Sequence, residues 1–282
     1  MRTLWVVDLG LIPYDEALHL QHALVAAKKA DADFPDVLLL QEHPPVITIG
    51  RNGDESNIVA PRETLEQLGF QIFRVERGGD VTYHGPGQLV GYPILNLRHV
   101  PKPKDVGWFV WAIQEALIRV LADFGIRGER IEKVIGVWVR GQPMPELDDS
   151  FGERVRQALA SAYARYSDRK IVAIGARIEE WISYHGFALN VNTNLHHFDF
   201  IVPCGLRDRG VTSMERELGH TVSMPAVKAR TAYHFGRVFQ AEPVWREREE
   251  LEALFPPEAL EQAAERVALR SPYAQPGTPA RS

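Results

Sequence analysis

The sequence predicts an α/β protein, of the α+β type, with mixed β-sheets that carry helices on their outer faces. Short β-type runs and amphipathic helical periods alternate irregularly along the 282 residues. Charged residues make up 24% and hydrophobic residues 45% of the chain, as in ordinary globular proteins. We expect one main domain over residues 1–240, followed by a C-terminal helical extension with a disordered tail over residues 241–282.

In the first half of the chain, the helix with the clearest start and stop covers residues 105–124. Its apolar residues fall on one face, and Gly125 ends it. An earlier helical period covers residues 14–29. His43-Pro-Pro45 separates two apolar runs, because proline cannot continue a central strand. Strands are expected at residues 1–12, 37–40, 46–49, 73–75 and 89–97.

In the second half, strands are expected at residues 134–139, 171–174 and 186–192. A segment inserted at residues 141–169 carries a predicted capping box at Ser150–Glu153 and a helical period. A further helix begins at Ser223-Met-Pro225 and runs to about residue 240. A charged helix pair over residues 245–270 is interrupted at Pro256-Pro257.

Composition excludes several functional classes. No apolar run approaches the roughly 18 residues of a membrane helix, and Asp8 comes too early for a secretory signal, so we expect a cytoplasmic protein with no membrane partner. A net charge of −5 argues against a general nucleic-acid partner. The single cysteine, Cys204, excludes a disulfide framework and a multi-cysteine zinc site.

The segment Arg77-Gly-Gly-Asp-Val-Thr-Tyr-His-Gly-Pro-Gly-Gln88 concentrates glycines and hydrogen-bonding side chains. Glycines let the backbone approach a ligand closely, but they also form ordinary turns. A long turn between strands and a ligand-binding loop are therefore both compatible with it. The segment has neither the spacing of a phosphate-binding P-loop nor that of a dinucleotide fingerprint.

Two further residues could carry chemistry. Cys204 stands in Pro-Cys-Gly and is followed by Arg207 and Arg209, which would favour a thiolate if they pointed toward it. A small buried hydrophobic residue is the alternative reading. Lys170 heads a β-type run, either as a solvated strand end or as a partly desolvated amine suited to proton transfer.

In the segment Tyr184-His-Gly-Phe-Ala-Leu-Asn190, the histidine-glycine pair precedes an apolar strand. A core histidine with its polar atoms satisfied is one reading of His185. A metal site is disfavoured, because His196 and His197 are adjacent and no ligand spacing accompanies them. We expect no metal and no cofactor.

Taken together, these stretches resemble the octanoyltransferases of lipoate biosynthesis, also called lipoyl(octanoyl) transferases. The matching parts follow in the family's order: Arg77–Gln88, Lys170–Gly175, His185–Asn190, Pro203–Leu206 and Val211–Ser213. The resemblance covers roughly residues 35–240 and implies the fold of the lipoate and biotin protein ligase catalytic domain. The inserted segment 141–169 and the chain beyond residue 240 depart from the family's pattern.

The resemblance implies transfer of an octanoyl group from octanoyl-acyl carrier protein to a lysine of a lipoyl domain, in 2-oxoacid dehydrogenase complexes or the glycine cleavage H protein. It implies that Cys204 carries the acyl group as a thioester and that Lys170 is the acid/base partner. The acyl slot is then expected to be lined by Arg77, Gly78, Gly79, Asp80, Val81, Thr82, Tyr83, His84, Ala173, Ile174, Gly175, His185, Gly186 and Phe187.

Two other functions stay open at this point. An ATP-dependent lipoate or biotin ligase would share the fold but would not need a nucleophilic cysteine. A non-catalytic acyl- or carrier-binding protein would keep the slot without using the Lys170–Cys204 pair.

Overall fold

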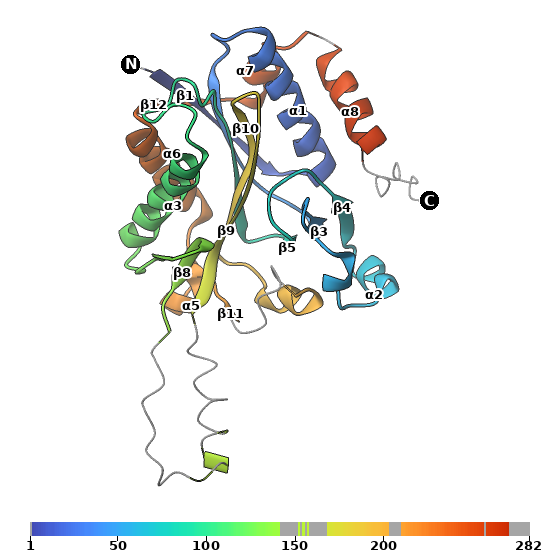
Figure 1. The fold of residues 1–282 in the computed structure, drawn as a ribbon, viewed down its shortest axis with the longest axis vertical. Helices are drawn as coiled ribbons and strands as arrows, with labels where there is room; N and C mark the ends of the chain where they lie inside the picture. Colours follow the sequence, from blue (N-terminus) through green and yellow to red (C-terminus); the bar gives the residue numbers. More distant parts are fainter. Residues whose placement is uncertain are drawn as a thin grey trace.

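The computed structural model describes residues 2–141, 152, 154–155, 157, 168–202, 210–256 and 258–270. Cys204, most of the inserted segment with its expected capping box, and the tail 271–282 lie outside the described residues. Two sheets are present in the described chain (Figure 1). The main sheet contains β1 (Arg2–Leu11), β2 (Asp36–Glu42), β6 (Gln88–Ile94), β7 (Glu129–Ile131), β8 (Val134–Val139), β9 (Arg169–Glu179), β10 (Ile182–Asn190), β11 (Gly210–Val211) and β12 (Ala241–Arg246).

The main sheet is mixed, as expected for the fold class. Its strand order is β12-β1-β2-β6-β10-β9-β8-β7, and β11 pairs with β9. Strand β1 runs parallel to both β2 and β12, whereas the run from β2 through β6, β10, β9 and β8 to β7 is antiparallel. Lys170, the expected acid/base residue, lies on β9, and His185, an expected slot residue, lies on β10, so both are on central, paired strands of the sheet.

Helices cover both faces of this sheet (Figure 1). On one face, α3 (Val106–Asp123) and α6 (Met224–Phe239) enclose the larger hydrophobic core, where the Phe187 ring stacks on Phe235 with centroids 5.4 Å apart. On the other face, α1 (Tyr14–Ala30) covers a second core. The helices predicted around residues 14–29, 105–124 and 223–240 are confirmed. Asp105 and Ser223 cap α3 and α6 through their side-chain oxygens, which accept from backbone N–H groups.

A separate sheet of three strands lies beside the main sheet. It contains β3 (Val46–Ile49) between β4 (Gln71–Arg74), which is parallel, and β5 (Val81–His84), which is antiparallel. One of its faces packs against α2 (Arg62–Gln67) and the 3₁₀ helix η2 (Leu195–Phe200); the shorter η1 covers Glu55–Asn57. Neither the continuous turn nor the continuous loop that the sequence suggested covers Arg77–Gln88, because Val81–His84 pair with β3 as a strand.

The extension expected beyond residue 240 begins with a strand of the main sheet. Strand β12 pairs with β1 in parallel, from Arg2 opposite Ala241 to Val7 opposite Arg246. The helix pair predicted over residues 245–270 is confirmed as α7 (Arg248–Glu252) and α8 (Ala259–Arg270). Helix α8 packs on α1, and its Val267 joins a small core with Tyr14 and Leu18.

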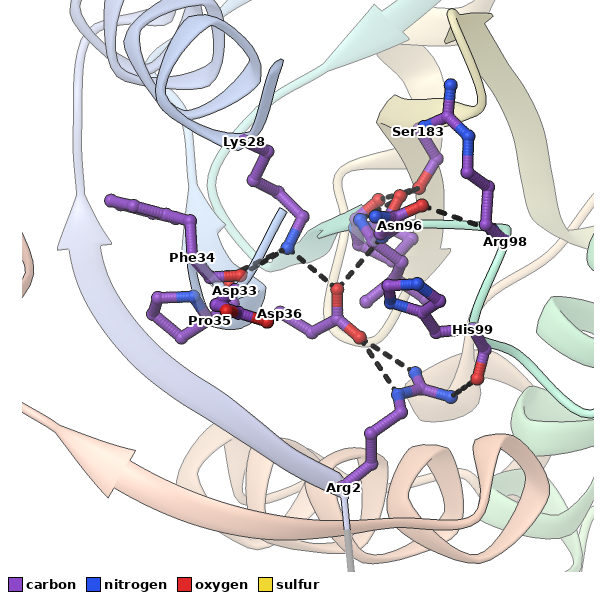
Figure 2. A network of polar contacts seen from close by, with 12 residues as sticks. Arg2, Lys28, Asp33, Phe34, Pro35, Asp36, Asn96, Arg98, His99 and Ser183 are labelled. Carbon is purple, nitrogen blue, oxygen red and sulfur yellow. Dashed lines mark hydrogen bonds and ion pairs between the residues drawn. The ribbon is translucent and has the colours of Figure 1, made fainter. Parts of the chain in front are cut away.

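A buried ion-pair network ties β1 to the start of β2 (Figure 2). The Asp36 carboxylate accepts from Lys28 Nζ at 2.8 Å, from Arg2 NH2 at 2.8 Å and from the Asn96 backbone N–H at 2.9 Å. Lys28 Nζ also donates to two backbone carbonyls, at 2.9 and 3.0 Å. Every charge in this network has a partner, which is the condition under which buried ions are tolerated.

Candidate functional site

The glycine-rich segment docks on the centre of β9. The Gly78 N–H donates to the Ala176 carbonyl at 3.1 Å. A Cβ added at Gly175 would lie 2.8 Å from Gly78 O, and Gly79 has a φ of +89°. Both positions therefore require glycine for the turn to sit against the strand.

Arg77 places a buried cation behind this turn. Arg77 is only 7% exposed to solvent. Nε donates to Thr48 Oγ1 at 3.0 Å, NH2 donates to Thr48 O at 2.6 Å and NH1 donates to Gly78 O at 3.0 Å. These bonds fix the guanidinium between the two sheets.

The residues of β5 divide between the two faces of the small sheet. Val81 and Tyr83 pack toward η2, where the Tyr83 hydroxyl lies 2.7 Å from His197 Nδ1. Thr82 and His84 take the opposite face. Asp80, just before the strand, accepts from Asn57 Nδ2 at 2.7 Å and so braces a neighbouring loop. Thr82 and His84 thus lie on the face of the small sheet that points away from η2.

Five side chains form what we call the ring cluster: Tyr14, His43, His84, Tyr92 and His185. His43 directly follows β2, the other four come from α1, β5, β6 and β10, and all five are buried. Ring centroids lie 5.2 Å apart for Tyr14 and His43, 6.1 Å for His43 and His84, 6.0 Å for His43 and Tyr92, and 6.3 Å for Tyr92 and His185. The cluster combines aromatic rings with hydroxyl groups and ring nitrogens, and it contains no carboxylate.

Burial keeps the imidazoles of this cluster neutral. It lowers the pKa of His43 to about 4, and it lowers the pKa of His84 to about 3 with help from nearby His43 and Arg77. His43 Nδ1 lies 2.8 Å from the Ile12 carbonyl, so Nδ1 carries the proton. Nε2, 2.9 Å from the Tyr92 hydroxyl, is then the acceptor.

A chain of hydrogen bonds connects His84 to Lys170. His84 Nδ1 lies 2.8 Å from Gln88 Oε1, and Gln88 Nε2 donates to Asn190 Oδ1 at 2.9 Å. Asn190 Nδ2 donates to the Thr212 carbonyl at 2.9 Å, and the Thr212 N–H donates to the Lys170 carbonyl at 3.0 Å. Four of the stretches that matched the family pattern therefore meet in one network.

His185 has an unusual backbone. Its φ is +52°, which lets its ring stack on that of its neighbour Tyr184, with centroids 5.0 Å apart, instead of alternating across the strand. Neither ring nitrogen has a hydrogen-bond partner among the described residues, and burial holds the pKa of His185 well below its ordinary value. Its backbone N–H donates to Gln21 Oε1 at 2.7 Å.

The expected slot residues on β9 and β10 do not all face the same way. Ile174 and Phe187, which pair across the strands, lie on the face covered by α3 and α6. Ala173 and Gly175 take the opposite face, where the Arg77–Gly79 turn docks. Gly186 sits opposite Gly175, and a Cβ there would lie 2.3 Å from Gly91 O.

Sequence reasoning missed several residues of this site. Tyr14, His43 and Tyr92 are isolated in the sequence, and only the folding of α1, β2 and β6 brings them together. The one local signal was His43, which directly follows β2 and precedes two prolines. Gln88 and Asn190 end two of the stretches that match the family pattern, but the sequence indicated no role for either side chain in the site.

No three His, Cys, Asp or Glu side chains in the described parts of the chain are arranged to hold a metal ion. None of the described helices is long and apolar enough to cross a bilayer.

A family model described as the lipoyl protein ligase A/B catalytic domain matches residues 13–236. An octanoyltransferase of Caldicellulosiruptor saccharolyticus is 46% identical over 251 residues, which covers 88% of this chain and 94% of that protein. One from Solibacter usitatus is 45% identical over 242 residues, covering 86% and 96%. The chain belongs to the octanoyltransferases of the lipoyl protein ligase A/B family. It is thus an acyltransferase.

The fold of this octanoyltransferase is also found in solved ligases. A bipartite lipoate protein ligase of Thermoplasma acidophilum superposes with a TM-score of 0.65 at 14% identity, covering 95% of this chain and 92% of the ligase. A lipoate-protein ligase A bound with ATP gives a TM-score of 0.63 at 15% identity, covering 94% and 93%. The predicted α/β fold class and its likeness to ligase catalytic domains are confirmed.

Proposed function

We propose that this octanoyltransferase transfers an octanoyl group from octanoyl-acyl carrier protein to a specific lysine of a lipoyl domain. The acceptors would be the lipoyl domains of 2-oxoacid dehydrogenase complexes and the glycine cleavage H protein. Cys204 would carry the acyl group as a thioester, and Lys170 would be the acid/base group. The names of the relatives support octanoyl transfer; donor, acceptor and intermediate are the proposal.

The observation that carries the proposal is the hydrogen-bond network from His84 through Gln88, Asn190 and Thr212 to Lys170. It ties the glycine-rich segment to the backbone of the proposed base through the Gln88 and Asn190 side chains and the Thr212 backbone. Cys204 precedes Gly210 by six positions in the sequence, and Gly210 and Val211 pair with Arg169 and Lys170 of β9. This pairing brings the chain that follows the cysteine back to Lys170.

The first half-reaction forms the thioester. A free thiol is mostly protonated at neutral pH, so Lys170 either accepts the Cys204 proton or stabilises the thiolate as an ammonium. The sulfur attacks the carbonyl carbon of the carrier's thioester. Backbone N–H groups at Cys204 and Gly205, or the Lys170 ammonium, would stabilise the resulting oxyanion. The carrier's sulfur then leaves and takes up a proton.

The second half-reaction forms the amide. The acceptor lysine must lose a proton before it can attack the Cys204 thioester, and Lys170 would accept that proton. The C–N bond forms, the C–S bond breaks, and the Cys204 thiol is regenerated. Exchange between two thioesters is nearly balanced, whereas the amide product is more stable, so the overall reaction needs no nucleotide.

The acyl chain would lie beside the Arg77–Gly79 turn, along the face of β9 that carries Ala173, because the turn itself packs directly on Gly175. Burying seven CH₂ and CH₃ groups would contribute on the order of 5 kcal/mol at about 0.8 kcal/mol each. The neutral ring cluster would border this slot, since no charged imidazole or carboxylate there would oppose an apolar chain.

The test uses the full chain, octanoyl-acyl carrier protein and a lipoyl domain, without ATP. Intact mass spectrometry followed by peptide mapping should place the octanoyl group on Cys204, and addition of the lipoyl domain should transfer it to one lysine. Cys204→Ala should gain no adduct, and Lys170→Gln should form the thioester slowly. In a separate reaction with free octanoate and ATP, octanoylation of the lipoyl domain by the Cys204→Ala variant would instead identify a ligase. Absence of any octanoyl adduct on the natural chain would identify a non-catalytic binder.

A further inference from the structure

Strand β9 is bulged next to Lys170. Val137 of β8 lies opposite Val172, but the next residue, Trp138, lies opposite Lys170, so Ile171 is an extra residue on β9. Ile171 and Val172 are adjacent, yet both are fully buried in the core beneath α3 and α6. In a regular strand they would point to opposite faces. The bulge therefore turns Lys170 away from that core.

The turned side chain meets an aromatic ring. Lys170 Nζ lies 4.8 Å from the centre of the Trp138 ring, within the range of a cation–π contact. Trp138 is 1% exposed, so this ring is fixed by packing and lies away from water. Bulges are frequent next to active sites, where they redirect a side chain.

The neighbouring glycine leaves the space that this contact needs. Gly136 has a φ of +129°, and a Cβ there would lie 2.7 Å from Val172 O, 3.4 Å from Lys170 Cε and 3.5 Å from Trp138 Nε1. A side chain at this position would press on both members of the pair. The bulge, the glycine and the buried ring are separate features of β8 and β9 that converge on the Lys170 amine.

We propose that Trp138 is the positioning residue of the Lys170 amine. The ring face attracts the ammonium and holds Nζ at one place on the sheet, so that the amine does not sample the several rotamers open to a free lysine. This inference rests on the proposed acid/base role of Lys170. Trp138 itself transfers no proton and forms no covalent bond in this scheme, and it acts only through Lys170.

The test compares Trp138→Phe with Trp138→Leu in the full chain, by the rate of transfer from octanoyl-acyl carrier protein. Leucine removes the ring, so we expect kcat to fall by about thirtyfold, the size expected for loss of a desolvated cation–π contact, with little change in KM for the carrier. Phenylalanine keeps an aromatic face and should restore most of kcat. A Phe variant as slow as the Leu variant would overturn the proposal.

Two controls separate positioning from loss of packing. Val137→Ala also removes a buried side chain from β8, but on the opposite face, so it should lower the melting temperature and leave kcat unchanged. If Val137→Ala lowers kcat as much as Trp138→Leu does, the proposal is wrong. In the Lys170→Arg background, Trp138→Leu should slow the enzyme by much less than it does in the natural chain, because arginine no longer supplies the amine that the ring positions.

Failure of the underlying function gives a different result. If Lys170→Gln forms the Cys204 thioester at the natural rate, the acid/base role itself is wrong. If Lys170→Gln is slow but Trp138→Leu is not, only the positioning role of Trp138 is refuted.

Discussion

Substitution of Asp36 by asparagine should strongly destabilise the fold. The Asp36 side chain is 7% exposed, and that of its partner Lys28 is 2% exposed. The change leaves the Lys28 ammonium buried with only two carbonyl acceptors and leaves the Arg2 guanidinium without its carboxylate (Figure 2). Removing one partner of a buried ion pair costs about 3–5 kcal/mol, and we expect about 3 because the amide oxygen still accepts one bond. That corresponds to a drop in melting temperature of roughly 6–12 °C.

The destabilisation should also depend on pH. Burial already lowers the pKa of Lys28 below its ordinary value of 10.5, and Asp36 partly opposes this effect. Without the carboxylate, the pKa of Lys28 in the folded variant falls further, whereas in the unfolded chain it returns to 10.5. Between the lowered pKa of Lys28 in the folded variant and 10.5, the unfolded state therefore binds more protons than the folded state. As the pH rises through this window, the free energy of unfolding of the variant should increase toward that of the natural chain.

Guanidinium denaturation at several pH values measures both effects. Asp33→Asn is the matched control, because it removes the same charge at an exposed residue in the turn that precedes β2, and it should be nearly neutral. If Asp36→Asn changes the free energy of unfolding no more than Asp33→Asn does, the network does not stabilise the buried lysine as argued.

Four further outcomes follow from the site. Gly175→Ala would place a methyl group 2.8 Å from Gly78 O, so octanoyl transfer should fall sharply while circular dichroism stays that of the folded protein. Thr48→Val removes the hydroxyl that accepts from Arg77, and denaturant titration should show a loss of about 1–3 kcal/mol. The pKa of His84 is lowered to about 3, so its imidazole NMR signals should not titrate between pH 5 and 8. Since the unfolded chain takes up this proton below about 6.5 and the folded chain does not, His84 should contribute a loss of stability as the pH falls from 6.5 toward 3.

The sequence predicted the elements whose signals are local. Helices α3 and α6 combine an apolar face with a capping residue at the predicted start, and both appear at the expected place. Strand β5 was missed because glycines flank it on both sides and dominate the local pattern. Strand β12 was missed because it is a short edge strand that contains Glu242 and Pro243, and its pairing with β1 lies about 240 residues away along the chain.

The site was predictable only in part, for a similar reason. The motif residues Arg77, His84 and His185 were found from their neighbours in the sequence. The orientation of Lys170 depends on the bulge at Ile171 and that of His185 on its positive φ, and neither feature has a local signature in the sequence. The register between β9 and β10 decides whether Ile174 or Gly175 faces the Arg77–Gly79 turn. The sequence alone does not supply this register.

The pairing of β1 with β12 has a consequence for the growing polypeptide. Strand β1 leaves the ribosome long before the partner for its outer edge, residues 241–246, is synthesised. During most of translation, this edge therefore has free N–H and C=O groups, the kind of surface on which nascent chains associate with one another. A ribosome-bound chain halted before residue 241 should bind chaperones more strongly than one halted after β12 has emerged.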